Sequence, residues 1–200
     1  MAKRIITISR EFGSGGRFIG EEVAKKLGIA YYDKDIIGKI ADHAGLSPEY
    51  VQESSELSPR KGLFAYAFTG RDATGKSMGD IVYEAQRKVI LDIAEKESCV
   101  IIGRCADYVL DGTEGLIRVF LYADIKVREE RVRERNLYAD KDVLKNIHRI
   151  DRERRDYNRY YAGRDWEKPE NYDLLINTTQ IGVDGSVQLI KDYLKMRGLL

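Results

Sequence analysis

Short runs of β-branched and other apolar residues alternate along the chain with longer segments whose apolar residues recur every three or four positions. Runs of the first kind predict buried strands, and segments of the second kind predict amphipathic helices. We expect strands at Ile5–Ile8, Ile29–Tyr32, Val100–Ile102, Ile117–Tyr122 and Leu174–Asn177. We expect helices at Phe18–Leu27, Lys34–Ala44, Gly79–Lys96, Ile125–Asn136, Lys141–Tyr160 and Gly185–Arg197. This order predicts an α/β fold, with a parallel sheet of about five strands flanked by helices.

The stretch from Leu46 to Lys76 interrupts this order. It carries Pro48, Pro59 and several serines and glycines, and its hydrophobic periodicity is weak. Such a composition is typical of an irregular segment. Because a single domain typically has about 100 to 200 residues, we expect one domain over residues 1–200, with an insertion at about residues 46–78.

The charge of the chain is balanced, since 34 basic and 33 acidic residues leave a formal net charge of +1. No global field therefore recruits nucleic acid or a membrane, and any anion site must come from a local cluster. No apolar run approaches the ~18 residues of a spanning helix, and the first residues lack the apolar region of a signal peptide. Cys99 and Cys105 are too few for a disulfide framework. We expect a cytoplasmic protein with neither nucleic acid nor membrane as a partner.

Two stretches have features of a phosphate-binding loop. Gly70–Ser77 reads GRDATGKS and matches the pattern GxxxxGK[ST], whereas Ser9–Arg17 reads SREFGSGGR and has the glycines without the lysine or the Ser/Thr. Such a loop works because backbone N–H groups converge on phosphate oxygens at a helix N-terminus, where the helix dipole also favours negative charge. The geometry requires a buried strand before the loop and a helix after it.

This context favours the less regular stretch. A compact strand, RIITIS, precedes its glycines, and an amphipathic helix that stops at Gly28 follows them. A loop at Gly70 would leave too few later strands for a doubly wound sheet, whereas a loop at Gly13 begins one. We therefore assign phosphate binding to Gly13–Arg17 and interpret GRDATGKS as a surface loop with a solvated Lys76. An ordinary tight strand-to-helix turn is the alternative for the glycines of the assigned loop.

With this assignment the whole chain resembles the cytidylate kinase-like family of P-loop kinases. The segments that carry the resemblance are ITISREFGSGGRFIGEEVAKKLGIAYYDKDII, IIGRCADYVL, VFLYADIKVREERVRER and, most specifically, RERRDYNR at Arg152–Arg159. The last segment has every fixed position of the family's RxxRDxNR arrangement. The resemblance implies a three-layer P-loop kinase fold with an acceptor-binding insertion and a helical lid at about residues 141–168.

The spacing within this segment has a physical meaning of its own. On a helix, Arg152, Asp156 and Arg159 share one face, and Arg155 lies alongside. Guanidinium groups that flank a carboxylate can clamp a phosphate. The alternative is a solvated helix face with i,i+4 ion pairs. The repeated use of arginine, where lysine would serve solubility equally well, favours oxyanion recognition.

The resemblance implies roles for residues before the lid as well. Arg104 would contact the acceptor phosphate, with an ion pair to Asp107 as the alternative. Asp33 matches an acidic residue of the acceptor side, although a helix N-cap explains it about equally well.

Two arginines on the helix after the fourth strand match the donor side of the family. Arg128 and Arg131 would reach the donor phosphates. A solvated face shared with Glu129 and Glu130 is the alternative for both.

The chain departs from the family pattern at the loop itself. Gly16 stands at the lysine position, Phe18 at the threonine, and Ile102 where an acidic residue helps to organise Mg²⁺. Arg17 is the natural substitute for the lysine, because a guanidinium can bridge two phosphate oxygens. In the acceptor turn Lys34 replaces a serine. These departures put catalytic competence and cytidine specificity in question together.

The resulting hypothesis is a Mg²⁺-dependent transfer of the γ-phosphoryl group of ATP to a nucleoside monophosphate, CMP or dCMP by resemblance. The expected ATP-binding residues are Gly13, Ser14, Gly15, Gly16, Arg17 and Arg128. The expected acceptor-binding residues are Asp33, Arg104, Arg152, Asp156 and Arg159. Arg17, Arg131 and Arg155 would offset developing charge, and no residue is expected to hold the metal. The alternatives are a non-catalytic nucleotide-binding regulatory protein and a kinase of another small phosphate acceptor.

The choice between the two loops gives a direct prediction. Lys76→Ala should leave ATP affinity nearly unchanged, because the assigned loop lies elsewhere in the chain. Calorimetric titration of both proteins with ATP checks this, and a large loss of affinity would show that GRDATGKS is the phosphate loop.

Overall fold

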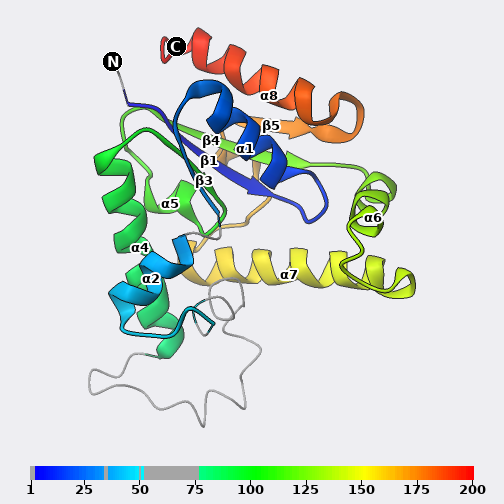
Figure 1. Cartoon of the computed structure of the whole chain (residues 1–200), viewed down its shortest axis with the longest axis horizontal. Helices are drawn as coiled ribbons and strands as arrows, with labels where there is room; N and C mark the ends of the chain where they lie inside the picture. Colours follow the sequence, from blue (N-terminus) through cyan, green and yellow to red (C-terminus); the bar gives the residue numbers. More distant parts are fainter. Residues whose placement is uncertain (1–2, 34–35, 50, 52–76) are drawn as a thin grey trace.

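The protein forms one parallel five-stranded sheet with helices on both faces (Figure 1). The computed structural model describes residues 3–33, 36–49, 51 and 77–200. The strands are β1 (Ile5–Arg10), β2 (Ala30–Tyr32), β3 (Cys99–Ile102), β4 (Leu116–Tyr122) and β5 (Leu174–Asn177). Their order is β2-β3-β1-β4-β5, and every neighbouring pair is parallel. The predicted sheet is confirmed, and its first strand is central, so the strand order reverses at β1 and the loop after it lies where such sheets bind ligands.

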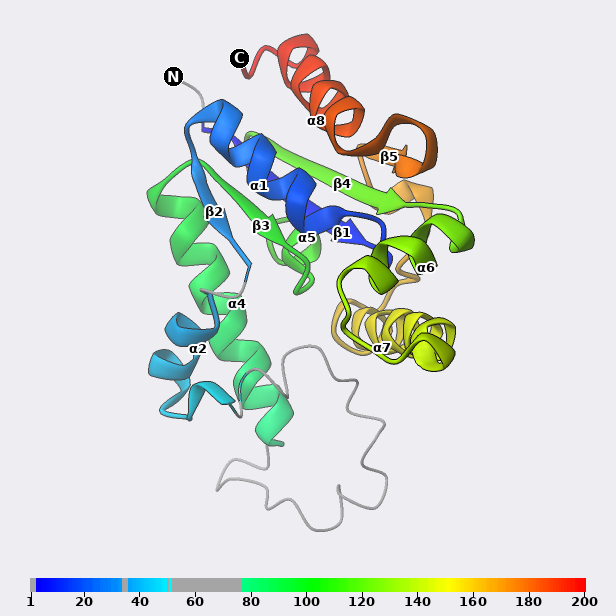
Figure 2. The same cartoon turned by 45° about the vertical axis from the view of Figure 1, so that its right-hand side comes forward.

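The helices make two layers around this sheet. Figure 2 shows α1 (Gly16–Leu27) and α8 (Thr178–Met196) together on one side of it. The opposite side carries α2 (Ile36–Ala44), α4 (Met78–Lys96) and α5 (Ala106–Val109), while α7 (Val143–Ala162) runs past the carboxyl ends of the strands. The helix α6 (Ile125–Glu134) follows β4 and packs against α7. The three-layer fold is therefore as predicted.

Alternation along the central strands divides the core between the two layers. Ile6 and Ile8 of β1 belong to the apolar cluster under α1 and α8, as does Ile102 of β3. Ile5 and Ile101 face the other way, into the cluster formed with α2, α4 and α5. Because side chains of a strand point alternately to its two faces, a continuous apolar run is required where both faces are covered.

Several boundaries differ from the sequence-based expectation. The last helix begins at Thr178 rather than Gly185, and its backbone bends at Gly182 with φ 60° and ψ −156°. A short 3-10 turn, Asp140–Asp142, precedes α7, so that helix begins later than expected. The four-residue α5 was not predicted, because a single turn is too short to show a periodicity. Most of the expected insertion, Lys76 included, lies outside the described residues; the limits of the insertion, the lid and the single domain stay predictions.

Two further observations concern membrane-spanning helices and the cysteines. Within the described ranges, no helix is long and apolar enough to cross a membrane. Cys99 and Cys105 are buried and form no disulfide. Burial raises the pKa of Cys99 to about 12, so its thiol stays protonated near neutral pH.

Helix α1 packs closely on the sheet through a glycine. A Cβ at Gly20 would lie 2.5 Å from Cδ1 of Ile102, 3.2 Å from Cε2 of Tyr31 and 3.3 Å from Cδ1 of Ile8. In contrast, a Cβ at Gly38 of α2 would meet nothing within 4 Å. We predict that Gly20→Ala lowers the free energy of unfolding by about 1–3 kcal/mol through overpacking. The control Gly38→Ala should be neutral or stabilising by up to about 1 kcal/mol, because alanine favours helices. Urea unfolding of both variants measures the difference, and equal effects would contradict the packing described here.

Candidate functional site

The loop between β1 and α1 makes a tight turn that only glycine fits at two positions. Gly13 and Gly15 have φ values of 85° and 93°, a region that side chains disfavour. A Cβ at Gly13 would also lie 2.9 Å from the carbonyl oxygen of Arg128. The amide of Ile19 donates to the carbonyl of Gly15 at 3.1 Å, so the turn leads directly into the first turn of α1. The loop therefore has the strand-turn-helix context that anion binding requires.

A buried arginine supports this loop from beneath. Arg128 of α6 is 5% exposed, its Nη1 lies 2.9 Å from Oε2 of Glu11, and its Nε donates to the carbonyl of Phe12 at 2.8 Å. Its Nη2 donates to Asp151 of α7, whose other oxygen accepts the amide of Phe12 at 2.7 Å. The solvated alternative for Arg128 is wrong. A contact with the donor phosphates stays a prediction, but protein atoms already engage all three nitrogens, which favours a supporting role.

A pocket of about 220 Å³ opens on the outer side of the loop. Among the described residues, its charged lining consists of Arg10, Glu11, Arg17, Asp33, Arg135 and Arg154. Arg17 and Asp33, predicted separately, are brought together here: Nε of Arg17 donates to Oδ2 of Asp33 at 2.6 Å. The Arg17 side chain remains 47% exposed, so it can still meet a ligand. Four arginines against two carboxylates make this pocket cationic.

Arg131 lies at the same loop and ties it to the start of α8. Its guanidinium donates to the hydroxyl and the carbonyl of Thr178 at 2.9 and 3.0 Å. The Thr178 hydroxyl in turn donates to the carbonyl of Ser14 at 2.8 Å. A Cβ at Gly15 would lie 3.9 Å from Nη1 of Arg131. The structure thus places this predicted residue against the glycine turn.

The cations around the loop repel one another. The pKa of Arg135 is lowered, first by burial and then by the charges of Arg17 and Arg131. A guanidinium whose charge is disfavoured by its neighbours gains from a bound anion. The pocket therefore suits a phosphate group.

A second, small pocket lies at the carboxyl end of β3. Arg104 lines it, is 9% exposed and has φ 59°. Its Nη1 donates to Gln86 of α4 at 3.3 Å, and the Gln86 amide donates to the Arg104 carbonyl and to the Tyr157 hydroxyl, both at 3.0 Å. Asp107, the alternative partner expected for Arg104, is paired with Arg164 instead. Hydrogen bonds with Gln86 therefore hold Arg104 at its predicted place at the end of β3.

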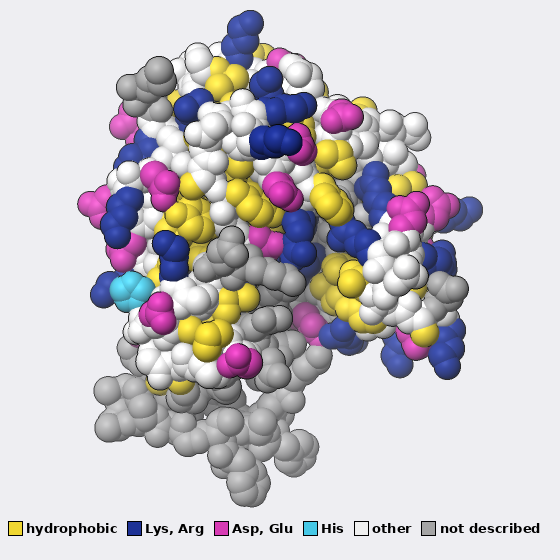
Figure 3. Space-filling model, viewed as in Figure 1, with side chains coloured by type: hydrophobic (Ala, Val, Ile, Leu, Met, Phe, Trp, Pro, Cys, Tyr) yellow, Lys and Arg dark blue, Asp and Glu magenta, His cyan; other side chains and the backbone are white. Residues whose placement is uncertain are grey.

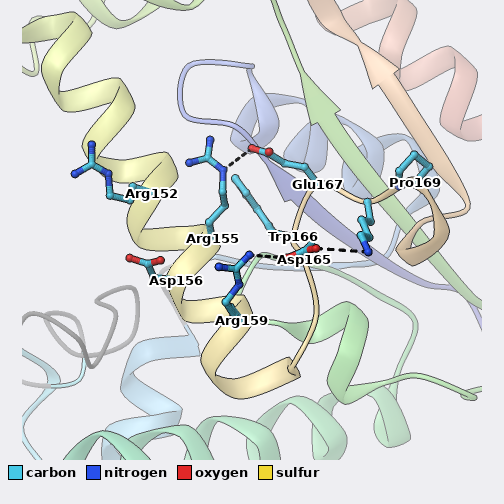
Figure 4. A pocket seen from close by; sticks show the side chains of 9 residues that line it. Arg152, Arg155, Asp156, Arg159, Asp165, Trp166, Glu167 and Pro169 are labelled. Atoms are coloured by element: carbon cyan, nitrogen blue, oxygen red, sulfur yellow. Dashed lines mark hydrogen bonds and ion pairs between the residues drawn. The ribbon is translucent and has the colours of Figure 1, made fainter.

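The predicted arginine face of α7 lines a third pocket, of about 460 Å³ (Figure 4). Arg155 donates to Glu167 at 2.9 Å and Arg159 to Asp165 at 2.7 Å, so carboxylates from the segment after α7 hold both guanidinium groups. Figure 4 shows Arg152 pointing away from these two pairs. Arg152, Arg155, Asp156 and Arg159 do share one face, but none of them lines the loop pocket.

The opposite face of α7 supplies two residues of the segment RERRDYNR to which the sequence assigned no individual role. Arg154 and Asn158 line the strand-end pocket, and Arg154 also lines the loop pocket. The Nη1 of Arg154 donates to the carbonyl of Arg10 at 2.9 Å, and its guanidinium lies 5.7 Å from the centre of the Phe12 ring. Arg10 lines both pockets as well. Its place at the carboxyl end of the first buried strand was a usable signal.

The loop pocket provides little for a metal ion. Its described lining holds two carboxylates, and an arginine engages each of them. Burial raises the pKa of Glu11, and Arg128 opposes this only in part. Ile102 lines the pocket where a carboxylate would help. Over the described part of the chain, no group of three or more metal-ligating side chains forms, so these residues do not make a dedicated magnesium site.

The surface charge agrees with a local anion site rather than a broad basic face. Figure 3 shows Lys and Arg side chains interspersed with Asp and Glu over the face viewed. The face viewed therefore carries no broad basic patch.

Comparison with known proteins agrees with this fold and shows the family. A family model described as the cytidylate kinase-like family matches residues 5–180. A cytidylate kinase from Pyrococcus horikoshii is 28% identical over 192 residues, which cover 94% of this chain and 87% of the relative. The solved structure of an uncharacterised protein from Eubacterium ventriosum is 26% identical, with a TM-score of 0.72 and coverage of 96% and 99%. A shikimate kinase from Bacteroides thetaiotaomicron shares the fold at 20% identity, with a TM-score of 0.55 and coverage of 96% and 98%.

The support beneath the loop gives a prediction about stability. Asp151→Ala should lower the free energy of unfolding by about 3–5 kcal/mol, because it removes the more buried of the two carboxylates that pair with the buried charge of Arg128. Glu129→Ala is the matched control, since it removes an exposed i,i+4 ion pair between Glu129 and Arg133 within α6. It should change the free energy of unfolding by at most about 0.5 kcal/mol. Urea unfolding measures both. Similar losses in the two variants would mean that Asp151 has no special role.

Proposed function

The chain belongs to the cytidylate kinase-like family, and from this premise we propose that it transfers the γ-phosphoryl group of ATP to a nucleoside monophosphate. One observation carries the proposal: a cationic pocket at the N-terminus of α1 adjoins a second arginine-lined pocket at the carboxyl end of β3. Two anion sites side by side suit a donor and an acceptor phosphate. The relatives named cytidylate kinase favour CMP or dCMP as the acceptor.

On the donor side, the glycine turn binds phosphate oxygens through its backbone and Arg17 binds them through its guanidinium. The Arg17–Asp33 contact orients that guanidinium at 2.6 Å. Arg128 acts indirectly, because it supports the loop from below. Arg131 holds the turn against α8 and adds positive potential beside Gly15. Phosphoryl transfer depends mainly on such positioning and charge neutralisation.

On the acceptor side, Arg104 binds the monophosphate at the end of β3, and Asp33 borders the neighbouring pocket. The α7 face with Arg152, Arg155 and Arg159 joins them when the lid closes. Glu167 and Asp165 hold two of these arginines in the open arrangement. Substrate phosphates would compete with those carboxylates, because both bind a guanidinium fork. Closure then excludes water from the reacting groups.

Magnesium would enter with the nucleotide. Mg²⁺ commonly keeps several waters and binds substrate phosphates with few protein ligands, which fits a pocket without a dedicated metal site. When bound, it neutralises charge on the phosphates.

A coupled assay with ATP, Mg²⁺ and a panel of nucleoside monophosphates tests the proposal. We expect turnover with CMP or dCMP, and we expect Arg17→Ala to lower kcat/KM about 10²–10³-fold through loss of charge stabilisation. The control Arg197→Ala should have no effect, because Arg197 lies at the end of α8 against Tyr193.

Two outcomes would change the conclusion. Tight ATP binding without turnover on any acceptor would overturn the kinase and favour a regulatory nucleotide-binding protein. Activity on another acceptor, with CMP inert, would keep the kinase and replace its substrate.

A further inference from the structure

The side chain of Arg10 occupies the space that a side chain at position 16 would need. A Cβ at Gly16 would lie 2.7 Å from Cγ, 3.0 Å from Cβ and 3.5 Å from Cδ of Arg10. These are its three nearest neighbours, and all belong to Arg10. Gly16 is the first residue of α1, and its φ is not positive. The presence of Arg10, rather than the backbone, is what requires glycine at this position.

A second glycine accommodates the other end of the same side chain. A Cβ at Gly103 would overlap the Arg10 guanidinium, and all three of its nearest neighbours are atoms of that group. Gly103 directly follows β3, and its φ of 67° favours glycine independently of Arg10. The Arg10 side chain thus runs from the start of α1 to the carboxyl end of the neighbouring strand, across a path kept clear by two glycines.

This path joins the two proposed phosphate sites. Of the described residues, Arg10 and Arg154 line both the loop pocket and the Arg104 pocket. Arg154 donates to the carbonyl of Arg10 at 2.9 Å, which ties α7 to the same point. A guanidinium between donor and acceptor lies where a transferred phosphoryl group must pass.

The place of the Arg10 guanidinium also bears on the lysine that is absent from the phosphate loop. In phosphate loops that carry the lysine, its ammonium reaches the β- and γ-phosphates, and Gly16 stands at that place here. Arg17 is held by Asp33 at the outer wall of the pocket. We propose that Arg10 replaces the loop lysine as a catalytic residue that contacts the transferring phosphoryl group, and that Gly16 is a glycine because Arg10 occupies this place. This inference rests on the proposed kinase function.

A purely structural role for Arg10 makes different predictions. Its methylene groups pack over Gly16, and this packing would survive replacement by methionine, which has a similar unbranched stem and no charge. A charge at position 16 would be irrelevant to packing. Two changes therefore distinguish the roles: removal of the charge at position 10, and addition of a charge at position 16 instead.

The experiment compares Arg10→Met, Arg10→Ala, Gly16→Lys and the double variant Arg10→Ala/Gly16→Lys. We expect Arg10→Met and Arg10→Ala to lower kcat at least about 100-fold, with little change in the KM of the acceptor. Gly16→Lys alone should be impaired by its collision with Arg10. The double variant should recover at least about tenfold over Arg10→Ala. The control Arg10→Ala/Gly38→Lys adds the same charge at an open site and should recover nothing. Thermal unfolding of each variant verifies that it is folded.

The outcomes separate this inference from the proposed function. If the wild type turns over and Arg10→Met keeps more than about a third of kcat, the inference is wrong and the kinase stands. Equal activity of the double variant and its control would also overturn it. If the wild type acts on no acceptor, the kinase proposal fails, and calorimetric titration with ATP decides the role of Arg10. A roughly tenfold weaker affinity in folded Arg10→Met, regained in the double variant but not in its control, supports a phosphate contact; unchanged affinity overturns it.

Discussion

The buried guanidinium of Arg128 is the contact on which the candidate site depends. It joins three parts of the chain that are distant in sequence: the loop after β1 through Glu11 and Phe12, its own helix α6, and α7 through Asp151. A buried charge is tolerated only where its partners are well placed. The contact therefore fixes the loop and the arginine-bearing helix relative to each other. The same guanidinium therefore holds both walls of the site, the loop after β1 and the helix α7.

The site then follows from the topology of the sheet. The strand order reverses at β1, and β3 pairs with β1, so the loop after β1 and the strand end at Arg104 lie next to each other at the carboxyl edge. The opposite faces of α7 serve different pockets: Arg154 points to the loop and strand end, while Arg155 and Arg159 lie in the outer pocket with Asp165 and Glu167. A single helix thus contributes one set of cations to the inner site and keeps another set paired outside it.

The sequence predicted the strands and the sheet well, because a strand covered on both faces must be apolar along its whole length, and that signal is local. It also predicted the shared face of Arg152, Asp156 and Arg159, since helical spacing is local too. It did not predict which pocket that face would line, because that depends on how α7 packs. Burial of Arg128 was equally out of reach: its partner Asp151 lies 23 residues away, and arginine next to two glutamates is typical of a solvated helix. The departure from the family pattern at Gly16 was visible in the sequence. Its explanation, the contact with Arg10, can be seen only in the three-dimensional structure.

The overlap between position 16 and the Arg10 side chain also has an evolutionary consequence. A chain with a lysine at position 16 cannot gain an arginine at position 10 without steric conflict, and a chain with neither has no cation at either place. The two arrangements are lysine at position 16 and arginine at position 10. Whichever position changes first, the intermediate chain has either a steric conflict or no cation. Positions 10 and 16 should therefore vary together among related chains. A search that scores loop positions independently will overlook this pairing, whereas one that scores the two positions jointly will find it.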